Sequence, residues 1–323
     1  MIITVTLNPA LDKTASVDVM RANELNRLQN VRVDAGGKGV NVSSIIHALG
    51  GKSVAVGFAG GGAGDELRLL IANKSLHADL VRIAATTRTN LKVMDEHGLL
   101  TELNEPGPAV TKAEWQNMEE KLLSYAQAGN IIVLSGSLPS TAEHAGFALG
   151  KDTYQKLSKR LRKCGAAVFL DADGEAFKLA LESGKDEVPN FIKPNRFELL
   201  QYFGLPDDES VNEAKLIELC QIMLAKGVEL VALSMGGDGA IFVNKNGAWK
   251  SAALPINVQS TVGAGDSMTG ALVYGFEQGL KETDCFALAM AASAGACTTK
   301  GTNPPSKALI DELLTKTMIE KIG

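Results

Sequence analysis

Residues 131–137 read Ile-Ile-Val-Leu-Ser-Gly-Ser, a short apolar run that passes directly into a polar, glycine-containing exit. Further apolar runs of this kind occur at residues 2–7, 54–58, 167–170 and 230–233. Because successive positions are apolar, the runs are typical of strands covered on both faces. Segments of helical period lie between them, at residues 111–127, 153–163, 212–226 and 284–298. This alternation predicts an α/β fold, a three-layer α/β/α sandwich around a mostly parallel sheet.

Polar and glycine-rich residues follow several of these predicted strands. The exits are residues 135–137 (SGS), 171–174 (DADG), 193–195 (KPN) and 234–237 (SMGG). Ligands of open parallel sheets bind beyond the carboxyl ends of the strands. We therefore expect the exits to converge on one crevice.

Two segments interrupt the alternation, at residues 15–35 and 88–105. Both are extended in character and partly polar, and the second contains a turn signal, Asp-Glu-His-Gly, at residues 95–98. We expect them to pair into a small β-sheet beside the core that could act as a lid. The chain shows no internal repeat, low-complexity tract or long linker, so residues 1–323 are expected to form one domain with this lid.

The composition excludes several classes of protein. Of 323 residues, 45% are hydrophobic and 21% are charged, and the net charge of −5 argues against nucleic acid or an anionic membrane as partner. The four cysteines show no CxxC pair or zinc-like spacing and are expected to be reduced and mostly buried. The sequence has no signal-peptide pattern and no run of ~20 apolar residues that could span a membrane. We expect a soluble, cytoplasmic protein.

The strongest motif is Thr-Val-Gly-Ala-Gly-Asp-Ser at residues 261–267, which precedes a helical segment at 268–279. Small residues before a helix let backbone N–H groups and the positive helix end face an anion. Asp266 is placed either to act as a catalytic base or simply to cap the helix. A serine-hydrolase interpretation is disfavoured, because Thr269 stands where GxSxG requires glycine and no histidine has a triad context.

A second motif, Ala-Gly-Gly-Lys-Gly-Val-Asn-Val-Ser at residues 35–43, opens another predicted helix. Its glycines permit close backbone approach, while Lys38 and Asn41 offer a charge and an amide to a polyhydroxyl ligand. The stretch is neither a Walker A motif nor a dinucleotide fingerprint. A plain loop is the alternative interpretation.

In the third motif, Lys-Pro-Asn-Arg-Phe-Glu at residues 193–198, Asn195 and Glu198 lie three residues apart at a predicted helix start. They could orient a hydrated Mg²⁺ or form a helix cap. The fourth motif, Ser-Met-Gly-Gly-Asp-Gly-Ala at residues 234–240, could let a nucleotide pass close to the backbone, or could be a tight turn.

These motifs occur in one order, with Asn-Pro-Ala-Leu-Asp at residues 8–12 in front of them and Ser-Gly-Ser-Leu-Pro at residues 135–139 between them. In this combination the sequence closely resembles the PfkB, or ribokinase-like, family of carbohydrate kinases over essentially the whole chain. The start at residue 8 and Thr-Arg-Thr-Asn at residues 87–90 are similar to the branch of 1-phosphofructokinases and tagatose-6-phosphate kinases. Residues 193–198 and 261–268 are more similar to 1-phosphofructokinases.

The resemblance implies a ribokinase-like fold with a β-sheet lid and an ATP- and Mg²⁺-dependent transfer to a ketohexose phosphate. It makes Asp266 the general base and Gly263, Ala264 and Gly265 the anion hole for the transferred phosphoryl group. The implied sugar-binding residues are Asp12, Gly36, Gly37, Lys38, Asn41 and Asn90. The implied nucleotide-site residues are Ser234, Gly236 and Gly239, together with Gly263 and Gly265; Lys193 and Asn195 lie near the phosphates, and Asn195 and Glu198 near Mg²⁺, through water.

A sugar that already carries a phosphate requires a cationic clamp. We expect Arg88 to supply it, helped by Lys38 and by the hydroxyl of Ser137, because guanidinium binds phosphate oxygens in a bidentate manner. Arg27, expected on a lid strand, could reach a phosphate across a homodimer formed through the lids, which the resemblance also suggests. Residues 171–174 depart from the family pattern after the first aspartate, so no role is carried over to Ala172 or Asp173.

Four functions are weighed on this basis. The leading one is phosphorylation of fructose 1-phosphate to fructose 1,6-bisphosphate, and the close alternative is phosphorylation of tagatose 6-phosphate. A non-catalytic sugar or nucleotide sensor on the same fold is disfavoured by the intact Gly-Ala-Gly-Asp sequence. An NAD oxidoreductase fits the α/β alternation but lacks a full dinucleotide fingerprint.

Overall fold

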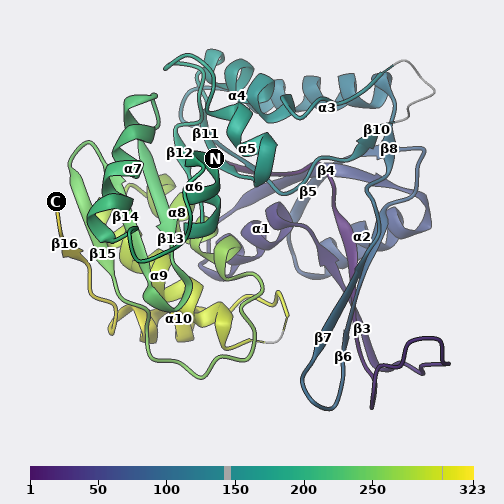
Figure 1. The fold of residues 1–323 in the computed structure, drawn as a ribbon. Coiled ribbons are helices and arrows are strands. Elements are labelled where there is room, and N and C mark those ends of the chain that lie inside the picture. Colours follow the sequence, from purple (N-terminus) through teal and green to yellow (C-terminus); the bar gives the residue numbers. More distant parts are fainter. Residues whose placement is uncertain (142–146, 300) are drawn as a thin grey trace.

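In the computed structural model, which describes residues 1–141, 147–299 and 301–323, a ten-stranded sheet runs through the middle of the molecule (Figure 1). Its parallel strands lie in the order β13 (Leu230–Ser234), β12 (Phe191–Ile192), β11 (Ala167–Asp171), β9 (Ile131–Ser135), β1 (Ile2–Thr6), β4 (Ser53–Gly60) and β5 (His77–Ile83). Antiparallel strands β14 (Ala240–Asn244), β15 (Gly247–Ser251) and β16 (Glu320–Lys321) extend the edge next to β13. The predicted, mostly parallel sheet is confirmed.

Helices cover both faces of this sheet. One face packs against α3 (Lys112–Tyr125), α4 (Thr153–Lys163), α5 (Gly174–Ala180), α6 (Arg196–Phe203) and α7 (Glu213–Ala225). The opposite face packs against α1 (Lys38–Ala48), α8 (Ala264–Glu277), α9 (Glu282–Cys297) and α10 (Lys307–Leu314). Strand side chains divide between the two cores, as Ile3 and Ile2 do in β1. The three-layer sandwich is therefore confirmed.

The start of α8 differs from the prediction. Sequence periodicity began this helix at residue 268, but the helix begins at Ala264, directly after Gly263 in the left-handed region at φ 83°. A glycine there costs little because it has no Cβ. As a consequence Asp266 lies within the first turn of the helix.

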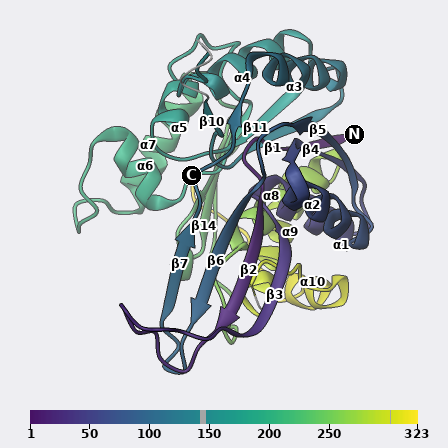
Figure 2. The same ribbon diagram turned by 90° about the vertical axis from the view of Figure 1, so that its right-hand side faces the viewer.

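A second, four-stranded sheet projects from the core (Figure 2). Its order is β3 (Gln29–Gly36), β2 (Ala10–Ser16), β6 (Arg88–Met94) and β7 (Leu100–Asn104). The predicted turn joins β6 to β7, where the Gly98 N–H donates to the Asp95 carbonyl over 3.0 Å. The sheet begins at residue 10, five residues before the predicted segment, and Arg27 lies in the link between β2 and β3 and not on a strand as expected. We call these four strands the small sheet.

Helix α2 (Gly61–Asn73) packs Leu67 and Ile71 against Leu11 and Ala35 of the small sheet and so joins it to the core. A short parallel pair, β8 (Ala109–Val110) and β10 (Ser140–Thr141), lies apart from both sheets in the hydrogen-bonding pattern. Across the described ranges, no helix combines the length and the apolar character needed to cross a bilayer.

Candidate active site

A cavity of about 520 Å³ lies between the small sheet and the carboxyl ends of the parallel strands. The exits of β9, β11, β12 and β13 contribute Ser137, Asp171, Lys193 and Ser234 to its wall, as the sequence predicted. The small sheet contributes residues of β2 and β6, and the starts of α1 and α8 complete the wall. Main-chain segments far apart in sequence thus meet at one place.

Most of the predicted site residues line this cavity. They are Asp12, Gly37, Lys38, Asn41, Arg88, Asn90, Ser137, Lys193, Asn195, Glu198, Ser234, Gly263, Gly265 and Asp266. The lining does not include Gly36, Ala264, Gly236 or Gly239. Gly36 has a structural reason to be glycine, because a Cβ there would lie 2.5 Å from Cγ of Asp12.

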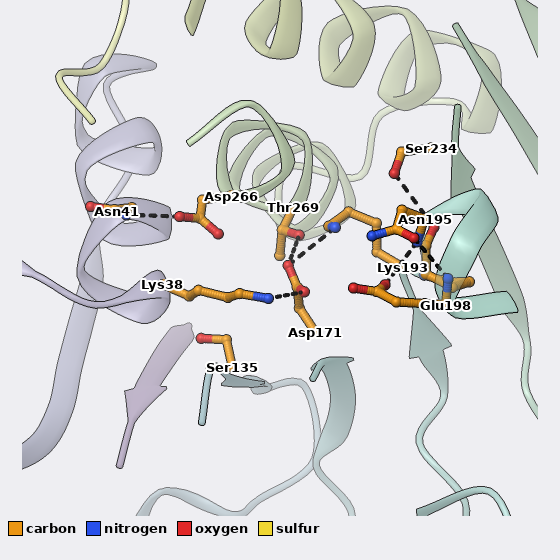
Figure 3. A network of polar contacts seen from close by, with 12 residues as sticks. Lys38, Asn41, Ser135, Asp171, Lys193, Asn195, Glu198, Ser234, Asp266 and Thr269 are labelled. Carbon is orange, nitrogen blue, oxygen red and sulfur yellow. Dashed lines mark hydrogen bonds and ion pairs between the residues drawn. The ribbon is translucent and has the colours of Figure 1, made fainter. Parts of the chain in front are cut away.

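Asp171, in the wall of the cavity, contacts two lysines (Figure 3). Its Oδ1 atom accepts a hydrogen bond from Lys38 Nζ over 3.0 Å, and its Oδ2 atom forms an ion pair with Lys193 Nζ at 3.3 Å. Burial alone would raise the pKa of this carboxyl, but the two ammonium groups overcome that effect and lower it to about 2. Asp171 is therefore a permanent anion that fixes the positions of both lysines.

Asp266 lies in the first turn of α8 and is 8% exposed. The amide of Asn41 on α1 donates to its Oδ2 atom over 2.7 Å (Figure 3). Burial, and then the negative charge of Asp171, raise the pKa of Asp266 to about 6, against the opposing effect of Asn41 and the lysines. A carboxylate with this proton affinity is suited to accept a proton near neutral pH.

The N-terminus of α8, beside this carboxylate, is suited to bind an anion. The first turn of a helix leaves N–H groups without intrahelical acceptors, and its dipole favours negative charge. Gly263 and Gly265 line the cavity here. A Cβ at Gly265 would lie 3.1 Å from Lys193 Nζ, so the lysine reaches the helix end. The arrangement combines backbone donors with a fixed cation.

Strands β2 and β6 supply polar groups at the other end of the cavity. The Asn90 amide donates to Asp12 Oδ1 over 2.9 Å, within a register that pairs these two residues. The Arg88 guanidinium donates to the backbone carbonyls of Asn8 and Glu105, over 3.1 and 3.3 Å. Buried Nε of Arg88 and buried Oδ1 of Asn90 have no hydrogen-bond partner in the described structure. The polar side chains of Asp12, Arg88 and Asn90 that line the cavity suit a polyhydroxyl ligand.

Asn195 and Glu198 form a capping box at the start of α6. The Asn195 side chain accepts from the Glu198 N–H, and Glu198 Oε2 accepts from the Asn195 N–H, each over 2.8 Å. The cap predicted as the alternative to metal binding is therefore present. Both residues also line the cavity, and burial raises the pKa of Glu198.

The donor set fits a water-mediated Mg²⁺ site, not a dedicated protein cage. Within the described ranges, no group of three or more His, Cys, Asp or Glu side chains is placed to hold a metal ion. The capping box uses Oε2 of Glu198 and leaves Oε1 for a metal-bound water. Mg²⁺ commonly retains several waters and takes its other ligands from substrate phosphates.

The fourth motif is divided between the cavity and a turn. Ser234 lines the cavity, and its N–H donates to the Pro194 carbonyl over 3.0 Å. Gly236 begins a short 3-10 helix, η2 (Gly236–Asp238). Gly239, at φ 90°, follows it, and a Cβ there would lie 2.0 Å from the Ser251 carbonyl oxygen. The geometry of Gly239 is explained by the turn.

The sequence assigned no role to eight further lining residues, although three of them lie in the predicted strand exits; they are Thr6, Asn8, Lys92, Gly136, Asp171, Asp173, Val262 and Thr302. Asp171 was expected at the crevice as the first residue of the exit at 171–174, but its role as partner of two lysines was not. Asn8 lies in the Asn-Pro-Ala start and donates to Ser137 Oγ over 3.1 Å. Thr302 gave no signal, because it lies in a loop whose position only the fold determines.

Comparison with known proteins is consistent along the whole chain. A family model described as pfkB family carbohydrate kinase matches residues 5–309. A 1-phosphofructokinase of Borreliella burgdorferi is 34% identical over 293 residues, covering 90% of each chain. A 1-phosphofructokinase of Rhodobacter capsulatus is 37% identical over 305 residues, covering 91% of this chain and 90% of the relative.

Similarity to solved structures is equally extensive. The crystal structure of phosphofructokinase-2 from Escherichia coli in complex with fructose-6-phosphate superposes with a TM-score of 0.87 and 27% identity, covering 98% of each chain. The range matched by the family model includes every residue named above as lining the cavity. The similarity therefore covers the small sheet as well as the core.

Proposed function

Because the chain belongs to the pfkB family of carbohydrate kinases, we propose that it transfers the γ-phosphoryl group of ATP to the 6-hydroxyl of fructose 1-phosphate. The products are fructose 1,6-bisphosphate and ADP. The choice of acceptor is supported by the curated relatives, which are 1-phosphofructokinases at identities of 34% and 37% over most of the chain. It is supported also by the cavity lining, which includes a carboxylate, Asp266, and a guanidinium, Arg88.

The observation that carries the proposal is the position of Asp266, a buried carboxylate beside the N-terminus of α8. The acceptor oxygen attacks the γ-phosphorus, its proton passes to Asp266, and the bond from the γ-phosphorus to the bridging oxygen breaks, leaving ADP. With a pKa of about 6, the carboxylate is ionised and ready for this proton at pH 7 and above.

The transferred group is stabilised by donors that are already in place. In this proposal the start of α8, where Gly263 and Gly265 line the cavity, receives the transferred phosphoryl, and Lys193 lies beside it. Ala264 stays part of the proposed anion hole, although its N–H donates to the Thr261 carbonyl over 3.4 Å. Asp171 holds Lys193 and Lys38 in position, so these cations need not reorganise during the reaction. Asn195 and Glu198 would hold Mg²⁺ through water, and the bound ion would supply positive charge to the triphosphate. Ser234, which lines the cavity, would border the nucleotide, and Gly236 begins the turn that follows it.

The sugar lies between the two ends of the cavity. Asp12, Asn41 and Asn90, with Gly37 and Lys38, contact its hydroxyl groups, and Arg88 and Ser137 bind the phosphate it already carries. Gly37 has φ 121°, and a Cβ there would lie 2.5 Å from Cγ2 of Thr6, so a glycine is needed to turn the chain into α1 at this place.

The test is ADP release from the purified protein with MgATP and a panel of acceptors: fructose 1-phosphate, tagatose 6-phosphate, fructose 6-phosphate and fructose. The highest kcat/KM is expected for fructose 1-phosphate. A higher value for tagatose 6-phosphate would overturn the acceptor while keeping the kinase chemistry. Absence of turnover with every phosphosugar would favour a sensor on the same fold.

The small sheet is also the proposed surface for a homodimer. It exposes several apolar side chains, among them Val31 at 49%, Leu100 at 46% and Leu103 at 53% exposure. Leu25, in the link between β2 and β3, is 78% exposed. A second copy of the chain would bury these groups, and would bring its Arg27 toward the sugar end of the cavity.

A further inference from the structure

Lys92 is a cation in the cavity that none of the motifs explains. Strand side chains alternate between faces, so residues 88, 90 and 92 of β6 point to the same side of the small sheet. All three line the cavity. The register places Lys92 opposite Thr14 of β2 and opposite Glu102 of β7. Lys92 therefore continues the row formed by Arg88 and Asn90.

The ammonium of Lys92 has unused hydrogen-bonding capacity. Its Nζ atom lies 3.8 Å from Glu102 Oε1, which is beyond hydrogen-bond distance, and it makes no hydrogen bond within the part of the chain that the structure describes. The side chain is nevertheless only 18% exposed. A lysine ammonium carries three donors, so this group faces the cavity with donors to offer.

The other lining cations are already engaged. Lys38 and Lys193 share the carboxylate of Asp171. Arg88 donates to two backbone carbonyls. Among the described lining residues, Asp12, Asp173, Glu198 and Asp266 add negative charge to that of Asp171. A cavity of this composition must admit an acceptor with a phosphate of about −2 charge beside a nucleotide.

We propose that Lys92 is a second phosphate-binding residue for the acceptor, which acts with Arg88 on the phosphate that the ketohexose already carries. At ~3.3 Å per residue the two Cα atoms are ~13 Å apart, a span that these two long side chains can close around one phosphate. Lys92 thereby contributes to the preference for a phosphorylated over a free ketohexose. The inference rests on the proposed function, since it requires a sugar phosphate as acceptor.

The test compares Lys92→Gln and Lys92→Arg with a matched control, Lys13→Gln. Lys13 lies on β2 directly across from Leu91, so it belongs to the opposite face of the same small sheet and does not line the cavity. KM and kcat are measured for fructose 1-phosphate, for free fructose and for ATP. Calorimetric titration of fructose 1-phosphate into the protein without nucleotide gives binding independently of turnover.

Lys92→Gln is expected to raise KM and Kd for fructose 1-phosphate by about 10- to 100-fold, the usual effect of losing a hydrogen bond to a charged group. KM for ATP and kcat/KM for free fructose stay within about twofold, and Lys13→Gln changes none of these values. Lys92→Arg retains most of the affinity because the charge is kept. The proposal would be overturned if the ratio of kcat/KM for fructose 1-phosphate to kcat/KM for free fructose did not change. It would also be overturned if only KM for ATP rose.

Glu102→Gln separates binding from a purely structural role. If Lys92 binds the phosphate, removing the competing carboxylate lowers KM for the sugar phosphate, opposite in sign to Lys92→Gln. If the pair only joined β6 to β7, both variants would lower the melting temperature and neither would change acceptor preference. Should the wild-type protein prefer another ketohexose phosphate, the proposed function fails, and the same measurements with that acceptor still decide the role of Lys92.

Discussion

The amide of Asn41 donates to the carboxylate of Asp266 over 2.7 Å, although the two residues are 225 positions apart in the sequence. The bond stabilises the charged carboxylate, whereas burial and Asp171 favour its protonated form and prevail. The proton affinity of the base is thus set jointly by α1, by the exit of β11 and by its own position in α8.

This balance predicts the pH dependence of the reaction. Because Asp266 must be ionised, kcat/KM should rise with pH through about 6 and level off above it. Asn41→Ala removes a group that lowers the pKa, so the acid limb moves to higher pH. Asp171→Asn removes a group that raises it, so the limb moves to lower pH. Profiles of kcat/KM from pH 4.5 to 8.5 check both variants. If the acid limb moved in the same direction for both, Asp266 would not be the group that titrates.

Asp266→Asn should abolish most turnover without affecting nucleotide binding. The amide cannot accept the proton of the attacking hydroxyl, and loss of a general base costs about 10²- to 10⁴-fold in kcat. ATP should bind with unchanged Kd, as measured by calorimetry. Turnover close to that of the wild-type protein would remove Asp266 from the role of base.

The same substitution should stabilise the protein at alkaline pH. A carboxyl whose folded pKa is raised contributes stability below its unfolded value, near 4, and loses that contribution as the pH rises through about 6. At pH 8 the buried charge therefore costs on the order of 3 kcal/mol, which Asp266→Asn removes. Urea unfolding should show a difference at pH 8 that shrinks toward pH 4. If Asp266→Asn were less stable than the wild-type protein at both pH 4 and pH 8, the buried charge would not be what destabilises the wild-type protein at pH 8.

Arg88→Ala should weaken the sugar phosphate selectively. The guanidinium is held by the carbonyls of Asn8 and Glu105, so it is pre-positioned for a ligand. KM for fructose 1-phosphate is expected to rise at least about tenfold, with KM for ATP unchanged. Arg88→Lys should recover only part of the loss, because lysine cannot bind two oxygens in parallel. An unaltered KM would exclude the clamp.

Leu100→Glu should disrupt the proposed homodimer. The residue is 46% exposed on β7, and a charge at that place would have to be desolvated in a sheet-to-sheet contact. Sedimentation analysis should show a dimer for the wild-type protein and a monomer for the variant. Leu69→Glu is the matched control: the residue is 60% exposed on α2, outside the small sheet, and the variant should remain dimeric. If both variants had the same oligomeric state, the small sheet would not be the dimer interface.

Much of the fold followed from local pattern, because the buried parallel strands are apolar at most positions. Strand β5 has exposed and half-buried residues mixed along its length, and β16 contains only Glu320 and Lys321, so neither has a comparable signal. Helix α8 started earlier than its periodicity indicated, since the left-handed Gly263 sets the helix start. Edge strands and helix starts depend on tertiary contacts, and the periodicity of the sequence carries no information about those contacts.

The cavity-lining residues could be predicted where they belong to motifs at strand ends. They were predicted less well where only the tertiary fold places them in the cavity wall. Lys193, Asn195 and Ser234 illustrate the first case. Lys92 and Thr302 illustrate the second, because a lysine on a partly polar strand and a threonine in a loop are common and carry no pattern. The predicted Asn195–Glu198 pair shows that one sequence pattern can report a helix cap and a cavity wall together.

The division of the cavity between two sheets has a consequence for how such a protein can diverge. Asp12, Arg88 and Asn90 come from two short strands of the small sheet, whereas Asp266, Lys193 and Ser234 belong to the core. Substitutions in those strands can change which acceptor is used while the phosphoryl-donor half keeps its geometry. Replacing β2 and β6 with the corresponding strands of a homologue should therefore be enough to change the acceptor preference.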